Sequence, residues 1–211
     1  GAGPSSLTVA EILARKGHKA VVYEREPQPG GLLIYGIPRF KLATEIVRAK
    51  TDWLRLLGIV FECNTDVGKD IAFNDIKAEY DAVFIGAGAK TDFRPGLPGE
   101  DLTGVMEATE FLCRANLPKG ILPLAWQAPM EIGPRVHVLG SGNTAMDCLR
   151  TALRLPGVKE VTCYYRRSEE EMPCCHEEYR HAQEEGAEFL WKVSRTAFLG
   201  DDAGHVRAVR Y

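Results

Sequence analysis

A glycine-rich turn in the second half of the chain has the residue spacing with the clearest chemistry. The stretch VHVLGSGNTAMDC places Gly140, Gly142 and Ala145 in the pattern G-x-G-x-x-A, between an apolar run and a helical pattern. The first glycine permits a tight turn, the second lets a ligand approach the backbone, and the alanine keeps helix and strand close. The helix N-terminus that follows attracts negative charge. The pattern predicts that a dinucleotide pyrophosphate binds at the turn that contains Gly140 and Gly142; glycines of an ordinary turn are the alternative.

Two arginines predict which dinucleotide binds there. Arg166 and Arg167 follow the next apolar run, in CYYRRSEE, where an NAD-binding unit usually has Asp or Glu. Guanidinium groups pair with phosphate, whereas a carboxylate repels it. We therefore expect the 2′-phosphate of NADPH at this place. A solvated basic pair at the end of a strand is the alternative.

An earlier copy of the turn begins the chain. GAGPSS supplies Gly1 and Gly3 in the same spacing, with the small Ser6 in place of the third Gly or Ala. Glu24 follows Gly1 by 23 residues, the spacing expected for an acid that accepts hydrogen bonds from a ribose. One acidic and one basic unit suggest two different dinucleotides. We expect NADPH at the second turn and FAD at the first, bound by Gly1, Gly3, Ser6 and Glu24.

The elements that must hold these turns alternate between helix and strand. For the first half, the sequence predicts helices over 5–16 and 43–57 and strands over 19–24, 59–63 and 81–88. For the second half, it predicts strands over 135–140, 160–165 and 187–193, helices over 108–115, 144–155 and 176–185, and a final hairpin strand over 206–211. This order predicts an α/β fold with two Rossmann-like units, each doubly wound and three-layered.

Two of these elements also carry predictions about burial. The continuous apolar run DAVFIGAG, residues 81–88, is typical of a strand that is buried on both faces. The core-facing residues of the helix over 43–57 are predicted to be Ile46, Val47, Trp53, Leu54 and Leu57.

Composition excludes several classes of protein. The 211 residues include 26 Lys and Arg against 29 Asp and Glu, a net charge of −3, and the basic residues are scattered. This argues against a nucleic-acid-binding face or an anionic-membrane face. No apolar run approaches the roughly 18 residues of a membrane span. We expect a cytoplasmic protein.

The six cysteines show no spacing typical of metal ligands. They are Cys63, Cys113, Cys148, Cys163, Cys174 and Cys175, and none forms a C-x-x-C pair. We predict reduced thiols and no metal site. A strained redox ring between Cys174 and Cys175 is the less favoured alternative, because neighbouring cysteines seldom meet the usual disulfide geometry.

Four stretches together resemble a known family. GAGPSS, GGLLIYGIPRFKL, LGSGNTAMDC and YYRRSEEEMP are similar to the small (β) subunit of NADPH-dependent glutamate synthase. The same module occurs in the N-terminal part of dihydropyrimidine dehydrogenase and in NADPH–ferredoxin electron-transfer subunits. The resemblance implies hydride transfer from NADPH to FAD, after which electrons leave through 4Fe-4S clusters of the parent assembly. It also implies FAD contacts at Pro4, Ser5, Gly31, Leu32, Lys41, Val67, Ala87 and Gly88, and NADPH contacts at Ser141, Asn143 and Thr144.

The resemblance further implies an FAD domain that is interrupted by an NADPH domain. We expect a partial FAD-binding domain over 1–108, a connection over 109–133 and a partial NADPH-binding domain over 134–211. In the family, a strand precedes the first glycine turn, iron–sulfur segments lie upstream, and a late motif completes the FAD site. Since the sequence shows none of these, we expect a piece of a longer protein.

The function predicted for the parent protein is NADPH-dependent flavin oxidoreduction of the glutamate synthase small-subunit type. Its partner would be an iron–sulfur domain or a large catalytic subunit, and the isolated piece is expected to be inactive. The cofactors carry this chemistry, so no side chain is predicted to be catalytic. The alternatives are an NADPH–ferredoxin-type or dihydropyrimidine-dehydrogenase-type subunit, and a non-catalytic dinucleotide-binding fragment. A disulfide reductase would need a cysteine pair near the flavin, and residues 30–42 contain no cysteine.

Overall fold

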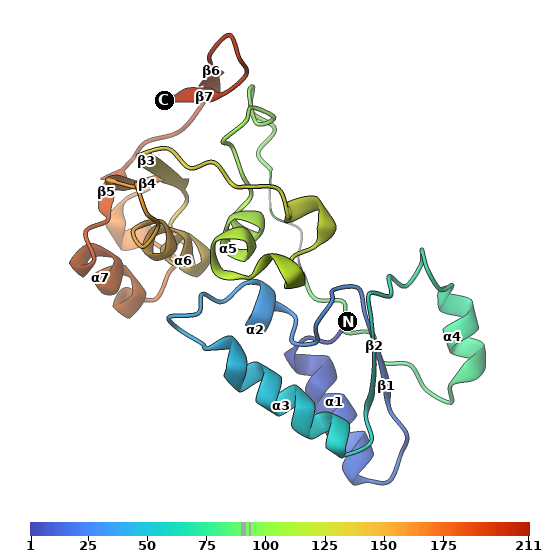
Figure 1. Ribbon diagram of the computed structural model, residues 1–211. Coiled ribbons are helices and arrows are strands. Elements are labelled where there is room, and N and C mark those ends of the chain that lie inside the picture. The colour runs from blue at the N-terminus through green and yellow to red at the C-terminus, as the bar shows by residue number, and fades with distance from the viewer. Residues whose placement is uncertain (90–91, 93) are drawn as a thin grey trace. The chain divides into compact units, whose positions relative to one another are not determined.

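The chain divides into two compact units in the computed structural model, which describes residues 1–89, 92 and 94–211 (Figure 1). Unit 1 consists of Gly1–Lys90 and Asn116–Gln127, and unit 2 of Thr91–Ala115 and Ala128–Tyr211. The chain therefore passes from unit 1 to unit 2 after residue 90, returns to unit 1 for residues 116–127, and then continues in unit 2. The sequence predicts the end of one domain and a connection in this region. The assignment of one cofactor to each domain stays a prediction.

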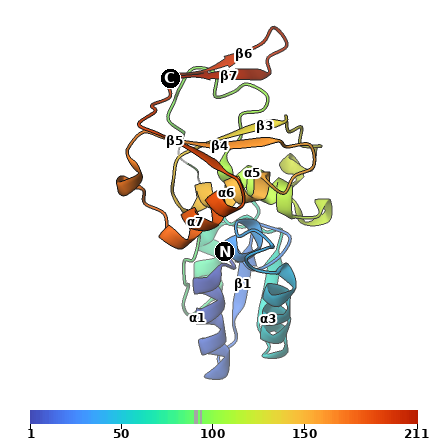
Figure 2. The same ribbon diagram turned by 90° about the vertical axis from the view of Figure 1, so that its left-hand side faces the viewer.

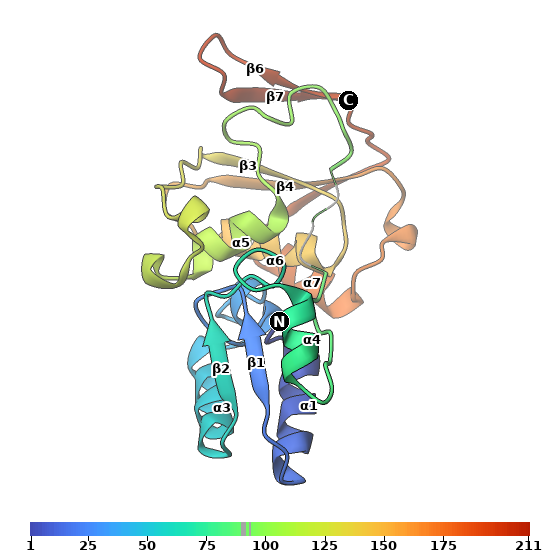
Figure 3. The ribbon, with the colours of Figure 1, turned by 90° about the vertical axis from the view of Figure 1, so that its right-hand side faces the viewer.

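Unit 1 is built around two parallel strands, β1 and β2, which pair from Val21 opposite Val60 to Glu24 opposite Cys63. Helices α1 and α3 cover one face of the pair, and α4 lies on the other (Figures 1 and 3). The elements are α1 (Pro4–Arg15), β1 (Val21–Glu24), α2 (Leu32–Tyr35), α3 (Thr44–Leu56), β2 (Val60–Cys63), α4 (Phe73–Glu79) and the 3-10 turns η1 (Lys119–Ile121) and η2 (Leu124–Trp126). The predicted helices over 5–16 and 43–57 and the first two strands are thus confirmed.

Helix α1 forms where its sequence allows it to begin, pack and end. Pro4 occupies the first turn, where a missing N–H costs nothing, and Gly17 follows the helix with φ 84°, a conformation that glycine adopts readily. Leu7 and Ala10 on its inner face are buried together with Val22 of β1. This packing fixes the start of α1 against the end of β1.

Helix α3 presents a narrower apolar stripe than the sequence predicts. Val47 and Leu54 are buried, and Trp53 and Leu57 are partly buried, but Ile46 is 63% exposed. The prediction for Ile46 is wrong: Ile46 lies on the same side of the helix as Trp53, but the core against which Trp53 packs does not extend to the first turn of α3, where Ile46 lies.

The predicted strand over 81–88 is also wrong. The segment has no regular structure, and Phe84 and Ile85 are 53% and 70% exposed. Within the described residues, the sheet of unit 1 consists of β1 and β2 alone. The apolar run therefore has no neighbouring strand to complete a hydrogen-bonded ladder.

Unit 2 repeats the strand–helix–strand order around three parallel strands in the order β3-β4-β5. Helices α6 and α7 cover one face of this sheet, and the antiparallel β6–β7 hairpin lies on the other side (Figure 2). The elements are α5 (Ala108–Asn116), β3 (Arg135–Leu139), α6 (Asn143–Ala152), β4 (Glu160–Tyr165), the 3-10 turn η3 (Glu169–Glu171), α7 (His176–Glu184), β5 (Glu188–Trp191), β6 (Ala197–Gly200) and β7 (Val206–Arg210). Every element predicted for this half is confirmed within a few residues.

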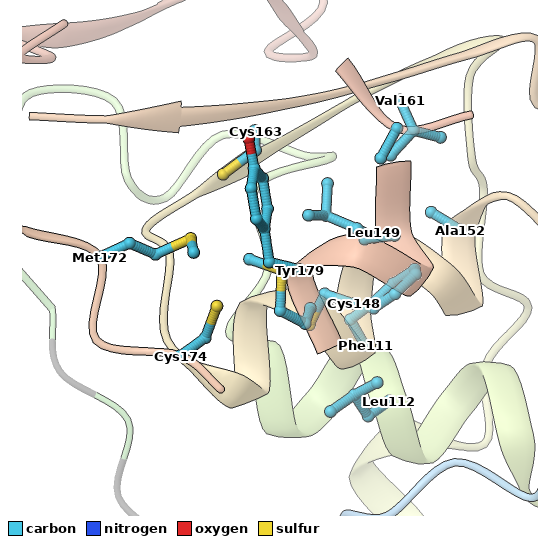
Figure 4. Packing of buried hydrophobic residues seen from close by; sticks show 13 residues of the cluster. Phe111, Leu112, Cys148, Leu149, Ala152, Val161, Cys163, Met172, Cys174 and Tyr179 are labelled. Atoms are coloured by element: carbon cyan, nitrogen blue, oxygen red, sulfur yellow. The ribbon is translucent and has the colours of Figure 1, made fainter. Parts of the chain in front are cut away.

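The core of unit 2 lies between its sheet and its helices (Figure 4). Met146 and Leu149 of α6 pack with Val161 and Cys163 of β4, and all four side chains are at most 1% exposed. Burying a side chain such as Leu149 stabilises the fold by about 1.5–3 kcal/mol. This core fixes α6, and with it the turn that precedes α6, to strand β4.

An ionic network also joins α6 to α7. Arg150 of α6 donates hydrogen bonds to Glu178 at 3.0 Å and to Glu185 at 2.8 Å, and Arg154 donates to Glu185 as well. These two arginines hold the pKa of the Glu185 carboxyl down at about 2.

None of the helices in the described residues has the length and the apolar composition of a membrane-spanning helix.

Candidate dinucleotide sites

The first glycine turn runs directly into α1 and packs against a distant segment. A Cβ atom on Gly1 would collide with the carbonyl oxygen of Gly86, and it would lie 3.6 Å from the Cα atom of Ala87. The side chain of Ser6, a residue that is 7% exposed, also lies against Gly86. The structure therefore brings the predicted residues Gly1, Ser6 and Ala87 together.

The turn at Gly30 and Gly31 packs against the first glycine turn. The N–H of Gly30 donates a hydrogen bond to the carbonyl of Ala2 at 2.8 Å. A Cβ on Gly31 would lie 2.7 Å from the Cα atom of Gly3, and Gly31 has a φ of 53°. Both the close approach and the backbone conformation require glycine here. Gly31 thus joins the first turn, as predicted, and Leu32, 43% exposed, begins α2 next to it.

Glu24 lies at the carboxyl end of β1, bound to the first turn. Its Oε2 accepts a hydrogen bond from the N–H of Ala2 at 2.6 Å, and its Oε1 accepts one from the N–H of Glu26 at 2.9 Å. The residue is only 5% exposed. Each carboxylate oxygen has a second lone pair, so the group can still accept hydrogen bonds from ribose hydroxyls.

The second glycine turn is joined to β4 by the backbone N–H and the carbonyl of Gly140. Gly140, with a φ of 124°, donates its N–H to the carbonyl of Tyr164 at 3.0 Å, and its carbonyl accepts from the thiol of Cys163 at 3.1 Å. Burial raises the pKa of Cys163 to about 12, which keeps this thiol protonated and able to donate. Sequence reasoning missed Cys163, whose place opposite Val138, next to the turn, follows from the β3–β4 register.

The side chains of the second turn point to different surroundings. Ser141 is 2% exposed, and within the described residues its buried Oγ has no hydrogen-bond partner. Asn143 begins α6, and its Oδ1 accepts a hydrogen bond from the N–H of Cys175 at 2.9 Å. Thr144 is exposed. Hence Ser141 has unused hydrogen-bonding capacity, whereas the oxygen of Asn143 is already engaged.

The second glycine of each turn has free space above it. Gly3 and Gly142 precede α1 and α6 with φ and ψ of −75° and 177°, and of −79° and 175°, which any residue can adopt. Apart from its chain neighbours, a Cβ added at either position would meet no atom of the described residues within 4 Å. The fold itself therefore does not require glycine at either position. An open, Cβ-free approach to a helix N-terminus is what a dinucleotide pyrophosphate requires, so both turns fit such a group.

The arginine pair follows β4 on the surface. Arg166 and Arg167 are both exposed, and neither guanidinium forms an ion pair with any residue that the structure describes. The carbonyl of Arg167 accepts a hydrogen bond from the N–H of Lys192 at 3.0 Å, which fixes the backbone next to β5. Two unpaired guanidinium groups can bind a phosphate without first breaking an ion pair.

The other predicted contacts of the first site lie in turns. Lys41 is half-buried after α2, and Val67, 38% exposed, follows β2 close to Thr65, whose N–H donates to the carbonyl of Glu24 at 2.9 Å. Gly88, with a φ of 71°, continues the segment that contacts Gly1. Pro4 and Ser5 form the exposed first turn of α1. Their cofactor roles stay predictions. Among the described residues, no three His, Cys, Asp or Glu side chains are placed to hold a metal ion.

A family model described as pyridine nucleotide-disulphide oxidoreductase matches residues 1–209. The chain belongs to this family. The match confirms the predicted oxidoreductase class.

The resemblance to glutamate synthase small subunits is confirmed by similarity to individual proteins. The glutamate synthase [NADPH] small chain of Escherichia coli is 44% identical over 215 residues, which cover all of this chain and 45% of that protein. The putative oxidoreductase AegA of the same organism is also 44% identical, and the chain covers 32% of it. The chain thus spans less than half the length of these relatives.

Solved structures confirm the fold class. FprA from Mycobacterium tuberculosis, solved in complex with NADPH, matches with a TM-score of 0.78 at 20% identity, over all of this chain and 65% of that protein. Thioredoxin reductase of T. acidophilum matches with a TM-score of 0.64 at 16% identity, over 99% of this chain and 67% of that protein. The α/β fold with two Rossmann-like units, predicted from the two glycine turns, is therefore correct.

Proposed function

We propose that this chain is the electron-input module of a longer NADPH-dependent flavoprotein oxidoreductase, of the glutamate synthase small-subunit type. FAD binds at the first glycine turn in unit 1, and NADPH binds at the second in unit 2. When bound, the nicotinamide and the flavin supply hydride transfer. Electrons then pass to 4Fe-4S clusters and a large catalytic subunit or iron–sulfur domain of a cytoplasmic assembly.

The observation that carries this proposal is the match between Gly3 and Gly142. Both precede a helix of at least ten residues with almost the same backbone dihedral angles, and both leave the space above the helix N-terminus open. Two such openings in one chain support two bound dinucleotides. The similarity to a glutamate synthase [NADPH] small chain supports the choice of NADPH for one of them.

The residues at the ends of β1 and β4 support the assignment of each cofactor. Glu24 is a buried acid whose charge would repel a 2′-phosphate, and it is oriented by the N–H groups of Ala2 and Glu26. Arg166 and Arg167 supply the opposite charge at the equivalent place in unit 2. The protein thus contributes binding, orientation and electrostatic selection, and the cofactors contribute the reaction.

Two binding measurements test the proposal. Calorimetric titration of the chain with NADPH and with NADH should show preferential binding of NADPH. Titration of the full-length protein with FAD should produce a yellow complex whose flavin spectrum bleaches when NADPH is added without oxygen. Equal affinity for the two nicotinamide nucleotides would contradict the assignment of unit 2, and a colourless protein would contradict that of unit 1.

The alternatives predict other outcomes of the same experiments. A non-catalytic fragment would bind NADPH, but the full-length protein would not reduce the flavin. A disulfide reductase would consume NADPH with a disulfide substrate. Its cysteine pair is absent from residues 30–42, which lie against the first turn through Gly30 and Gly31. NADPH–ferredoxin-type and dihydropyrimidine-dehydrogenase-type modules differ in the acceptor, which reconstitution with candidate partner subunits identifies.

A further inference from the structure

The ten residues that follow β4 form a segment that leaves the sheet and returns to the second glycine turn. This segment, residues 166–175, begins with the two arginines and ends at Cys175, directly before α7. Ser168 and Glu171 form a capping box around η3 in its middle, and the hydroxyl of Tyr165 donates to the carbonyl of Glu171 at 3.2 Å. Internal bonds therefore give the segment a defined shape.

One hydrogen bond joins this segment to the glycine turn. The N–H of Cys175 donates to Oδ1 of Asn143 at 2.9 Å, and it is the one hydrogen bond that connects residues 166–175 with residues 140–144 in the described part of the chain. The donor is a backbone amide, so only the oxygen of the Asn143 side chain can accept from it. The backbone N–H of Asn143, in the first turn of α6, stays free to face a phosphate.

We propose that Asn143 is a positioning residue for cofactor selectivity, which acts through Cys175 and not through a side-chain contact with the dinucleotide. Its bond fixes the end of the segment that carries Arg166 and Arg167 relative to the turn that holds the pyrophosphate. The 2′-phosphate and the pyrophosphate are linked through the same ribose, which limits the distance between them, so the spacing of their two binding groups affects how well both are bound together. This inference rests on the proposed binding of NADPH at unit 2.

The neighbouring contacts explain why the bond matters for the arginines. The side chains of Arg166 and Arg167 form no ion pair with a described residue, so the backbone alone places them. The bond from Lys192 to the carbonyl of Arg167 holds one end of the segment, and the bond from Cys175 to Asn143 holds the other. Removing the second bond frees the end that meets the glycine turn.

Four variants test the proposal from both sides of the bond. Asn143→Ala removes the acceptor, and Cys175→Pro removes the donor while keeping a backbone φ, −62°, that proline adopts. Asn143→Asp keeps the accepting oxygen but adds a negative charge near the pyrophosphate. Cys175→Ala is the matched control, because it removes the thiol and keeps the N–H.

Calorimetric affinities for NADPH and NADH, taken as a ratio, provide the readout. We expect Asn143→Ala and Cys175→Pro each to lower the NADPH-to-NADH preference about three- to tenfold, in line with the loss of one hydrogen bond. Asn143→Asp should weaken both nucleotides but keep the ratio, and Cys175→Ala should change neither. A ratio that stays constant in Asn143→Ala and Cys175→Pro, with both nucleotides weakened, would show that Asn143 only contacts the shared pyrophosphate or supports the fold, and would overturn the proposal.

A measurement on the unaltered chain keeps the proposal testable if these variants fold poorly. The amide of Cys175 should be protected from hydrogen exchange, and NADPH, which carries the 2′-phosphate, should increase this protection more than NADH does. Equal protection by the two probes would count against the proposal. If the unaltered chain binds neither nucleotide, the proposed function of unit 2 fails first, and the two failures are thereby distinguished.

Discussion

Gly3 and Gly142 have almost the same backbone conformation at the start of their helices. Apart from its chain neighbours, a Cβ atom at either position would meet no atom of the described residues within 4 Å. Other glycines of the same turns differ in this respect. Gly1 and Gly31 are required by close backbone contacts, and Gly140 by its positive φ. The fold thus requires glycine at Gly1, Gly31 and Gly140, whereas only a bound ligand explains the glycines at Gly3 and Gly142.

Gly142→Ala is expected to abolish NADPH binding and leave the stability of the chain within about 1 kcal/mol, because the backbone angles suit alanine and the added methyl group occupies only open space. Calorimetry and urea unfolding measure the two quantities. Gly140→Ala is the matched comparison, and its strained φ should cost about 1–3 kcal/mol. Tight NADPH binding by Gly142→Ala would show that the pyrophosphate does not approach this glycine.

Arg166→Glu combined with Arg167→Ser should remove the preference for NADPH. The loss of two charge-assisted phosphate contacts, and a new repulsion, should weaken NADPH by at least 100-fold while NADH changes little. Arg180→Glu on α7 is a control for net charge, since Arg180 is exposed and lies outside the predicted site. An unchanged preference would mean that the 2′-phosphate binds elsewhere.

Glu24→Ala should destabilise unit 1 by about 2 kcal/mol or more, because the N–H groups of Ala2 and Glu26 lose their buried acceptor. The same variant should lose FAD in a fluorescence-quenching titration. Glu62→Ala on the neighbouring strand β2 removes an exposed acid and should leave both quantities unchanged. Full FAD affinity in Glu24→Ala would contradict the ribose contact.

The network around Glu185 should make stability depend on pH. Since the pKa of Glu185 is lowered to about 2 in the folded chain, from its ordinary value of 4.5, its contribution is complete above pH 4.5 and is lost as the pH falls toward 2. Glu185→Gln should cost about 1–2 kcal/mol at pH 7 and flatten the pH dependence of urea unfolding in this window. Glu184→Gln, next to it on a more exposed pair, should cost less than about 0.5 kcal/mol. Equal pH profiles for Glu185→Gln and the unaltered chain would contradict the role of this network.

The cysteines should react with iodoacetamide in an order set by burial. Cys175 is exposed and should be alkylated first, and the half-buried Cys63 should follow more slowly because burial raises its pKa. Cys163, with a pKa of about 12, should resist alkylation at pH 8 until the chain unfolds. Peptide mass spectrometry after timed quenching gives the order. Rapid alkylation of Cys163 in the folded chain would contradict its bond to Gly140.

The sequence allows the elements around both turns to be predicted because their signals are local. The apolar spacing of α1, α3 and α6 and the short strands β1, β2, β3 and β4 recur in the structure. The predictions that are wrong depend on partners. The segment over 81–88 has strand composition, but a strand also needs a neighbour, and none in the described residues pairs with it.

The same distinction applies to the site residues. Glu24 could be predicted from motif spacing and Gly31 from the family resemblance, and the structure brings both to the first turn. The bonds of Cys163 to Gly140 and of Cys175 to Asn143 join residues 23 and 32 positions apart. No local pattern in the sequence encodes such pairs, because they depend on strand register and on how α7 packs beside α6.

Ala2 is held from two directions, since its N–H donates to Glu24 and its carbonyl accepts from Gly30. Residues 25–29 therefore connect two points that are both fixed to one alanine, which itself is fully buried. Such a connection has a fixed length, so an insertion or deletion here would pull either Glu24 or Gly30 away from the turn.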